Sequence, residues 1–158
     1  MLIRPFTPED ARTVATWSYE PPFDIYDGNP ASPEDYLAID DDGYGYYAIV
    51  TTWQELIGFC CFGPEAMVSG QQLDEDTVDI GGGVRPDLVS QGVATTVFPK
   101  IMEFARTRFG CATFRTAVAS FNERSLRLCQ SAGFVTVRSF EGPGREFQEL
   151  RRATDDDA

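Results

Sequence analysis

The stretch that decides the fold is PDLVSQGVATTV, residues 86–97. Pro86 ends a predicted strand, a short polar turn follows, and a helical pattern of apolar residues begins at Gly92. Gly92 and Ala94 therefore lie in the first helical turn, where neither adds to packing. Two explanations are open: a tight loop with a close helix contact, or an anion lying against the bare backbone. The second has a physical basis, because the free N–H groups and the dipole of a helix N-terminus attract anions.

Working outward from this turn, apolar periodicity and turn signals predict a mixed α/β (α+β) chain. We expect a mostly antiparallel sheet of six strands, or of seven if residues 145–152 also pair, flanked by about four helices. The strands are predicted at 2–6, 46–53, 55–63, 77–84, 112–118 and 134–140, and the helices at 8–17, 32–39, 92–109 and 122–132. Strands 77–84 and 112–118 are joined through a helix, which predicts that they are parallel. Three glycines, 81–83, suggest a bulge or the close approach of a ligand.

Length and composition bound the classes of function. The chain has 158 residues, 42% of them hydrophobic, and we expect one domain over 1–152 followed by a disordered acidic tail, 153–158. The absence of histidine excludes Ser–His and Cys–His nucleophiles, and four cysteines without a CxxC pair predict no metal site. A net charge of −12 argues against a nucleic-acid surface and would attract cationic amines. With no signal peptide and no membrane-length apolar run, we expect a cytoplasmic protein with no membrane partner.

Two motifs, VRPDLVSQGVA at 84–94 and NERSLRLCQSAGF at 122–134, carry a resemblance to a known family. In this order and at this separation they resemble the GNAT superfamily of acetyl-CoA-dependent N-acetyltransferases. In that family the first motif reads Gln/Arg-x-x-Gly-x-Gly/Ala and binds the pyrophosphate of CoA, and the second commonly reads Asn-x-x-Ala-x-x-Leu-Tyr before Gly-Phe. The resemblance implies a GNAT-like fold and acetyl-CoA as co-substrate. It also implies an amine-bearing small molecule or protein as acceptor, and we expect a monomer or homodimer.

The resemblance also implies which residues contact the co-substrate. Gly92 and Ala94 would let the pyrophosphate reach backbone amides, the Gly83 and Val84 backbone would face the pantetheine arm, and the later helix would border the cofactor. The predicted contacts are Gly83, Val84, Gln91, Gly92, Val93, Ala94, Thr95, Asn122 and Ser125. The sequence departs from the family twice: Val89 replaces the usual Gln or Arg, and Cys129 replaces the tyrosine that protonates the departing thiolate.

For the chemistry, Asp79 is the first candidate for the base that takes a proton from the ammonium, and Glu20 is the second. Asp79 is alternatively a strand-edge aspartate. Cys129 is a candidate acid, or a small residue packing beneath the pantetheine, and the Val84 N–H could hold the oxyanion. The aromatic loop WSYEPPFDIY predicts an acceptor wall of Tyr19, Phe23 and Tyr26, or else a flap over the core. Two other functions stay open, a CoA-binding sensor without catalysis and a nucleotide diphosphate-binding module.

Overall fold

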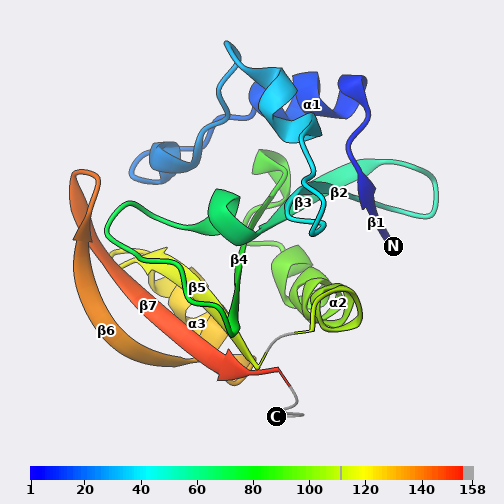
Figure 1. Ribbon diagram of the computed structural model, residues 1–158. Coiled ribbons are helices and arrows are strands. Elements are labelled where there is room, and N and C mark those ends of the chain that lie inside the picture. The colour runs from blue at the N-terminus through cyan, green and yellow to red at the C-terminus, as the bar shows by residue number, and fades with distance from the viewer. Residues whose placement is uncertain (111, 155–158) are drawn as a thin grey trace. The chain divides into compact units, whose positions relative to one another are not determined.

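The computed structural model describes residues 1–110 and 112–154. The chain divides into two compact units: unit 1 comprises Met1–Cys61 with Gly82–Val97, and unit 2 comprises Phe62–Gly81 with Phe98–Ala158. Within the described residues, seven strands are hydrogen-bonded in the order β1-β2-β3-β4-β5-β7-β6, and there are three α-helices (Figure 1). This confirms the predicted mixed, mostly antiparallel sheet, including its seventh strand. Of the about four helices predicted, three are α-helices and the one predicted at 32–39 is a 3₁₀ helix.

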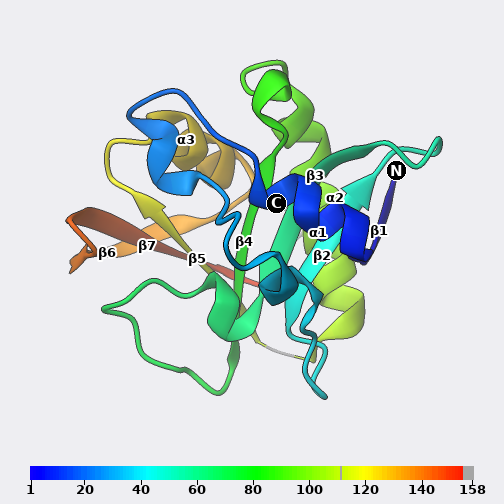
Figure 2. The same cartoon turned by 90° about the horizontal axis from the view of Figure 1, so that it is seen from above.

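Unit 1 begins with β1 (Leu2–Pro5) and α1 (Pro8–Ala15), followed by β2 (Gly45–Val50) and β3 (Leu56–Phe62). The predicted N-cap of α1 is confirmed as a capping box: the Asp10 amide donates to Thr7 Oγ1 at 3.1 Å, and the Thr7 amide donates to Asp10 Oδ2 at 3.0 Å. The helix lies over β2 and β3 (Figure 2), with Val14 packed in one cluster with Ala48 and Val50. Burial of this apolar face holds α1 against the sheet.

The predicted helix at 32–39 is a 3₁₀ helix, η2 (Pro33–Leu37), and a second 3₁₀ helix, η1 (Phe23–Tyr26), lies in the preceding loop. The Ser32 side chain makes no capping bond. The Asp35 amide instead donates to the Ser32 carbonyl at 3.2 Å, which is the i→i+3 pattern of a 3₁₀ turn. Without a cap, a segment of five residues does not propagate as an α-helix.

Unit 2 contains β5 (Thr113–Ala119), α3 (Glu123–Ser131), β6 (Val135–Gly142) and β7 (Arg145–Ala153). β7 lies between β5 and β6 and is antiparallel to both, and Figure 1 shows α3 behind β5 and β7. The two remaining elements, β4 (Thr77–Val84) and α2 (Val93–Arg108), have residues in both units, as does β3, whose last residue, Phe62, belongs to unit 2. The predicted parallel pairing of β4 with β5 is confirmed, with Thr77–Asp79 opposite Thr113–Arg115.

β7 ends next to the predicted domain boundary at 152, which stays a prediction. The strand continues to Ala153, and the buried Thr154 donates its backbone N–H to the Ala112 carbonyl at 3.1 Å. The remainder of the predicted acidic tail, 155–158, lies outside the described residues, as does Cys111. In the described part of the chain, no helix has both the length and the apolar character needed to cross a bilayer.

Gly28 tests how closely the loop after α1 approaches the end of that helix. A Cβ at this position would meet the carbonyl oxygens of Val14 and Ala15 at the end of α1. We expect Gly28→Ala to lower the free energy of unfolding by about 1–3 kcal/mol, as overpacking does. Chemical denaturation measures the change, and Gly110→Ala is the control because its Cβ would have no neighbour within 4 Å. Equal stability of the two variants would contradict this close approach.

Candidate active site

The turn that leads into α2 lies in unit 1 and provides an anion-binding geometry. After β4, the 3₁₀ helix η4 (Pro86–Leu88) reverses the chain, and both Ser90 (φ +66°) and Gly92 (φ +78°) adopt the left-handed conformation. Such a φ favours glycine, so the backbone conformation alone is a reason for glycine at position 92. A Cβ added there would meet nothing within 4 Å, so the space beside this backbone is open. The first amides of α2 have no partner within the helix and lie next to that space.

The polar side chains beside the turn form hydrogen bonds and ion pairs with neighbouring residues. Arg85 donates from Nε to Asp87 Oδ1 at 2.6 Å and from Nη1 to Glu55 Oε1 at 3.0 Å. Gln91 donates from Nε2 to the Asp87 carbonyl at 3.0 Å. The first turn of α2 contains no acidic residue, which would compete with an anion for the helix N-terminus.

The glycine run of β4 has a packing explanation at two of its three positions. A Cβ at Gly82 would lie 2.7 Å from the Phe59 carbonyl oxygen, and a Cβ at Gly83 would lie 3.0 Å from the Phe59 ring. The close neighbour at these two glycines is therefore β3. The sequence left open whether these glycines mark a bulge or the close approach of a ligand. At Gly82 and Gly83, the chain that approaches closely is the neighbouring strand β3.

The backbone of Val84 faces away from β3. The Arg85 amide donates to the Ile57 carbonyl at 2.9 Å, and because neighbouring residues of a strand point their polar groups to opposite sides, Val84 directs its N–H and C=O the other way. Tyr19 agrees with this orientation, because its hydroxyl donates to the Val84 carbonyl at 2.7 Å. The predicted acceptor loop and the predicted pantetheine strand are thus joined by a hydrogen bond that the sequence did not indicate.

The other residues predicted for the acceptor wall differ in exposure. Phe23 is partly buried, whereas Glu20 is exposed and Tyr26 is 40% exposed. Trp17, at the start of the loop, is buried in the core cluster of unit 1, and Tyr19 packs against that cluster. The sequence predicted either an acceptor wall or a flap over the core. The first residues of the loop cover the core, as a flap would, and its later side chains face solvent, where an acceptor could reach them.

Asp79, the first candidate base, is 4% exposed and belongs to unit 2. Both of its oxygens accept from Arg115, with Nε to Oδ1 at 2.6 Å and Nη2 to Oδ2 at 3.1 Å. Burial raises the pKa of Asp79 above its ordinary value, and the guanidinium opposes the increase. These contacts favour a structural ion pair in place of the strand-edge aspartate considered from sequence, and the role of base stays a prediction.

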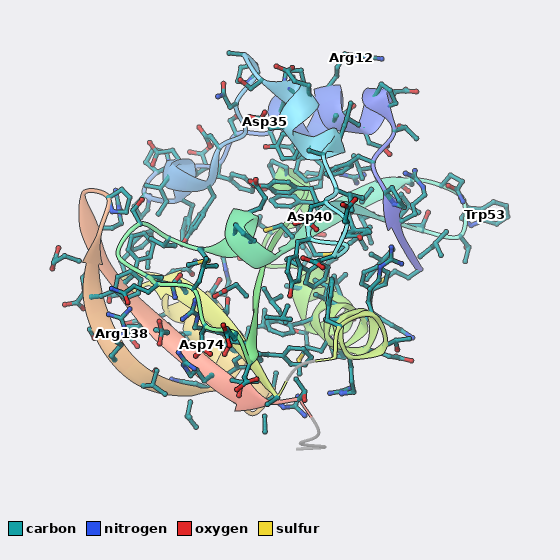
Figure 3. All side chains as sticks on the ribbon, viewed as in Figure 1. Arg12, Asp35, Asp40, Trp53, Asp74 and Arg138 are labelled. Atoms are coloured by element: carbon teal, nitrogen blue, oxygen red, sulfur yellow. The ribbon has the colours of Figure 1, made fainter. Side chains whose placement is uncertain are left out.

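Arg115 connects Asp79 to a larger charge network in unit 2 that the sequence did not reveal. Glu149, 3% exposed, accepts from Gln71 at 3.0 Å, from Arg138 at 3.3 Å and from Arg151 at 3.3 Å. Figure 3 labels Arg138 and Asp74, which lie beside β7; Asp74 accepts from Arg151 Nη1 at 3.0 Å. The three arginines also line a hollow of about 650 Å³, and each is paired with a carboxylate. Charged residues at interior strand positions were the available signal for this network.

The network makes stability depend on pH. Burial alone would raise the pKa of Glu149, but the hydrogen bonds from Gln71, Arg138 and Arg151 hold it below the ordinary value of 4.5. A folded-state pKa below the unfolded one means that the ionised carboxylate stabilises the folded protein above about pH 4.5. That contribution is lost as the pH falls through the folded-state pKa.

The helix α3 carries three predicted site residues. Asn122 is its N-cap, with Oδ1 accepting from the Ser125 amide at 3.2 Å. Ser125 is partly buried. Cys129 is 3% exposed, and burial raises the pKa of its thiol to about 12. A thiol with this pKa is a weak acid, which favours the packing explanation of Cys129. Among residues 1–110 and 112–154, no three His, Cys, Asp or Glu side chains gather in a way that could hold a metal ion.

Known proteins are similar to this chain in both sequence and fold. A family model described as "Acetyltransferase (GNAT) domain" matches residues 1–135. A chimeric spermidine N-acetyltransferase from Vibrio cholerae and hSSAT superposes with a TM-score of 0.74 at 16% identity, covering 97% of this chain and 95% of that one. Ribosomal-protein-alanine N-acetyltransferase from Brucella melitensis has a TM-score of 0.73 at 17% identity, covering 97% and 99%. At these identities the solved structures establish the fold alone. A search of curated proteins finds no significant match.

Asp79 and Arg115 can be tested by removing one charge. We expect Asp79→Asn to lower the free energy of unfolding by about 3–5 kcal/mol, because the Arg115 guanidinium stays buried without a counter-charge. The double variant Asp79→Asn/Arg115→Gln should recover part of this loss, and Asp76→Asn, an exposed neighbour, should be neutral. Denaturation curves and turnover are measured together. Unchanged stability with a turnover loss of about 10²-fold or more, relieved at high pH, would instead identify Asp79 as the base.

Proposed function

The chain belongs to the GNAT acetyltransferase family, and from this we propose that it transfers an acetyl group from acetyl-CoA directly to the nitrogen of a primary amine. The observation that carries the proposal is the open turn before α2. There, a left-handed Gly92 with no neighbour within 4 Å leads into a helix N-terminus without acidic residues. A pyrophosphate fits such a turn, since backbone amides and the helix dipole both favour negative charge.

In this proposal the amides of Gln91 to Thr95 bind the pyrophosphate, and the Gly83–Val84 backbone receives the pantetheine arm. Val84 is suited to this task because its N–H faces away from β3, on the side where Tyr19 bonds its carbonyl, so a ligand can accept from it as a strand would. Acetyl-CoA supplies the thioester. The Val84 N–H then stabilises the negative charge that develops on the thioester oxygen during attack.

Starting from the neutral amine, the protons of the reaction balance without a net acid or base, and an ammonium first releases its extra proton to bulk water. The amine nitrogen bonds to the acetyl carbon, the carbon–sulfur bond breaks, the nitrogen loses a proton and the departing sulfur gains one. A path through water is sufficient, provided that the ammonium first loses its own proton. The proposal therefore requires neither the buried Cys129 thiol nor the paired Asp79 carboxylate as a proton carrier.

A cationic amine is the acceptor class that the charge distribution supports. The chain has a net charge of −12, and residues 13–84, which include the predicted acceptor loop, contain no lysine or arginine. Such a field raises the local concentration of cations. The similar structures comprise a spermidine acetyltransferase and a ribosomal-protein-alanine acetyltransferase, so the fold serves both small and protein acceptors. We include a cytoplasmic location and a monomer or homodimer in the proposal; light scattering in solution tests the latter.

One observation favours a second candidate, a CoA-binding sensor without catalysis. Cys129, at the position where many family members carry the tyrosine acid, is a buried thiol with a pKa raised to about 12. A sensor would bind acetyl-CoA and CoA alike and would release no thiol with any amine. Calorimetry with acetyl-CoA, CoA and ATP, followed by thiol release across a panel of amines, separates the two candidates.

Gly92→Val tests the pyrophosphate turn. The added side chain should fill the open space and raise the dissociation constant of acetyl-CoA at least tenfold, about 1.4 kcal/mol. Because a β-branched residue is strained at this φ, the control is Gly144→Val, which has φ +70° and equally open surroundings but lies in the β6–β7 turn. Calorimetry on both variants measures the effect. If Gly92→Val binds acetyl-CoA as tightly as Gly144→Val does, this turn is not the co-substrate site.

Cys129→Ala tests whether the thiol is the acid. We expect turnover to fall by less than ~10-fold, below the range typical of a general acid. The pH–rate profile should keep its shape, because a thiol with a pKa of about 12 stays protonated throughout. A loss of about a hundredfold with acetyl-CoA binding intact would assign the proton transfer to Cys129.

A further inference from the structure

We propose that Tyr19 is a positioning residue for acetyl transfer: its hydroxyl holds the Val84 peptide at the end of β4, and so keeps the neighbouring Val84 N–H aimed at the reacting carbonyl. This inference rests on the proposed function and deepens it. The hydrogen bond from Tyr19 to the Val84 carbonyl, 2.7 Å long, lies wholly within unit 1.

The end of β4 needs such support because of its composition. Three successive glycines, 81–83, precede Val84, and glycine has the greatest backbone freedom of any residue. β3 restrains this segment from one side, where the Arg85 amide donates to the Ile57 carbonyl at 2.9 Å. Tyr19 restrains it from the other. The hydroxyl, the Val84–Arg85 peptide and the Ile57 carbonyl form one chain of hydrogen bonds, in which each bond polarises the next.

Tyr19 is itself held in place by its loop. Its backbone N–H donates to Asp27 Oδ1 at 2.8 Å, and the Gly28 amide closes the loop on the Trp17 carbonyl at 2.9 Å. The ring packs against the core cluster of unit 1. Burial, together with the charge of Asp27 and the nearby Tyr36, raises the pKa of Tyr19 to about 12. The phenol therefore stays protonated, and remains a donor, at every pH at which the protein would be assayed.

We expect the hydrogen bond from Tyr19 to accelerate the chemical step more than it strengthens the binding of acetyl-CoA. A preorganised donor stabilises developing charge without reorganising during the reaction, and removing one outright typically costs about 10²–10³-fold in rate. Loosening the Val84–Arg85 peptide, which adjoins the peptide of the donor, should cost less, on the order of tenfold, because the N–H itself remains. The co-substrate would still bind through the turn at Gly92, so its affinity should change little.

Tyr19→Phe tests the role with a matched control, Tyr47→Phe. Tyr47 also donates a phenol hydroxyl to a backbone carbonyl at 2.7 Å in unit 1, to Gly43, away from β4. Both variants keep the ring and lose one such bond, so a similar small fall in melting temperature is expected for each. Only Tyr19→Phe should lower kcat, by about tenfold, with the KM for acetyl-CoA within about threefold of wild type.

Asp27 provides a second variant that leaves the hydroxyl intact. Asp27→Ala removes the acceptor of the Tyr19 amide and should reproduce part of the kcat loss, whereas Asp27→Asn keeps an oxygen there and should restore it. The ratio of wild-type to Tyr19→Phe kcat should stay constant between about pH 6 and pH 9, since the role involves no proton transfer. A ratio that changes with pH would mean that Tyr19 exchanges a proton and is not a positioning residue.

The outcomes are distinct. If Tyr19→Phe matches Tyr47→Phe in both melting temperature and kcat, Tyr19 only anchors its loop and the proposal is wrong. If Tyr19→Phe instead raises the KM for acetyl-CoA with kcat unchanged, the hydroxyl contributes to binding alone. That result also contradicts the proposed positioning role. Should the wild-type protein neither bind acetyl-CoA in calorimetry nor release thiol with any amine, the proposed function itself fails, and the role of Tyr19 fails with it.

Discussion

β4 must meet two opposing requirements within eight residues. Its first part is locked into the sheet, with Thr77–Asp79 paired to β5 and Asp79 bonded to Arg115 through both oxygens. Further along, buried carbonyls have to find other partners. The Ile80 carbonyl accepts the Thr116 hydroxyl at 2.8 Å, and the Val84 carbonyl accepts the Tyr19 hydroxyl. At these two carbonyls, a side-chain hydroxyl donates the hydrogen bond that a neighbouring strand would otherwise supply. The second carbonyl, that of Val84, adjoins the backbone that is proposed to bind the co-substrate.

The charge network of unit 2 follows from the first of these requirements. Moving a charge out of water costs several kcal/mol for each ion, so a buried arginine is tolerated only where its partners are well placed. Arg115 meets Asp79 on the adjacent strand and lies near Glu149 on β7, while Gln71 and Asp74 connect the segment before β4 to the same group. Breaking a single pair would leave a buried charge without a partner, which disfavours a shifted strand register. The network thereby specifies how β4, β5 and β7 align.

Two of the predicted proton carriers, Cys129 and Asp79, are buried and constrained by their surroundings. Burial removes the Cys129 thiol from water and raises its pKa, and Asp79 has both oxygens bonded to Arg115. The groups to which the proposed function assigns the binding and the chemistry are instead backbone amides: those of the turn before α2 and that of Val84. An active site built from backbone groups depends on the conformation of the chain more than on the identity of side chains. This explains why a glycine, Gly92, stands in the turn where the co-substrate is proposed to bind, whereas Gly82 and Gly83 are accounted for by the close approach of β3.

The sequence by itself determined the order of the elements, the capping box of α1, the parallel β4–β5 pair and the turn at Gly92. The capping box and the turn depend on periodicity or on backbone conformation within a few residues, which local patterns encode, and the parallel pair follows from the order of the elements, because a helix joins the two strands. Local patterns also misled at 32–39, where a cap signature stood before a segment that forms only a 3₁₀ helix. Only the tertiary structure decided the partners of Asp79 and Tyr19. Their hydrogen bonds reach across 36 and 65 residues of chain, to Arg115 and Val84. The packing of strands and loops determines which distant side chain donates to a given acceptor. The spacing of residues along the chain carries no information about that packing.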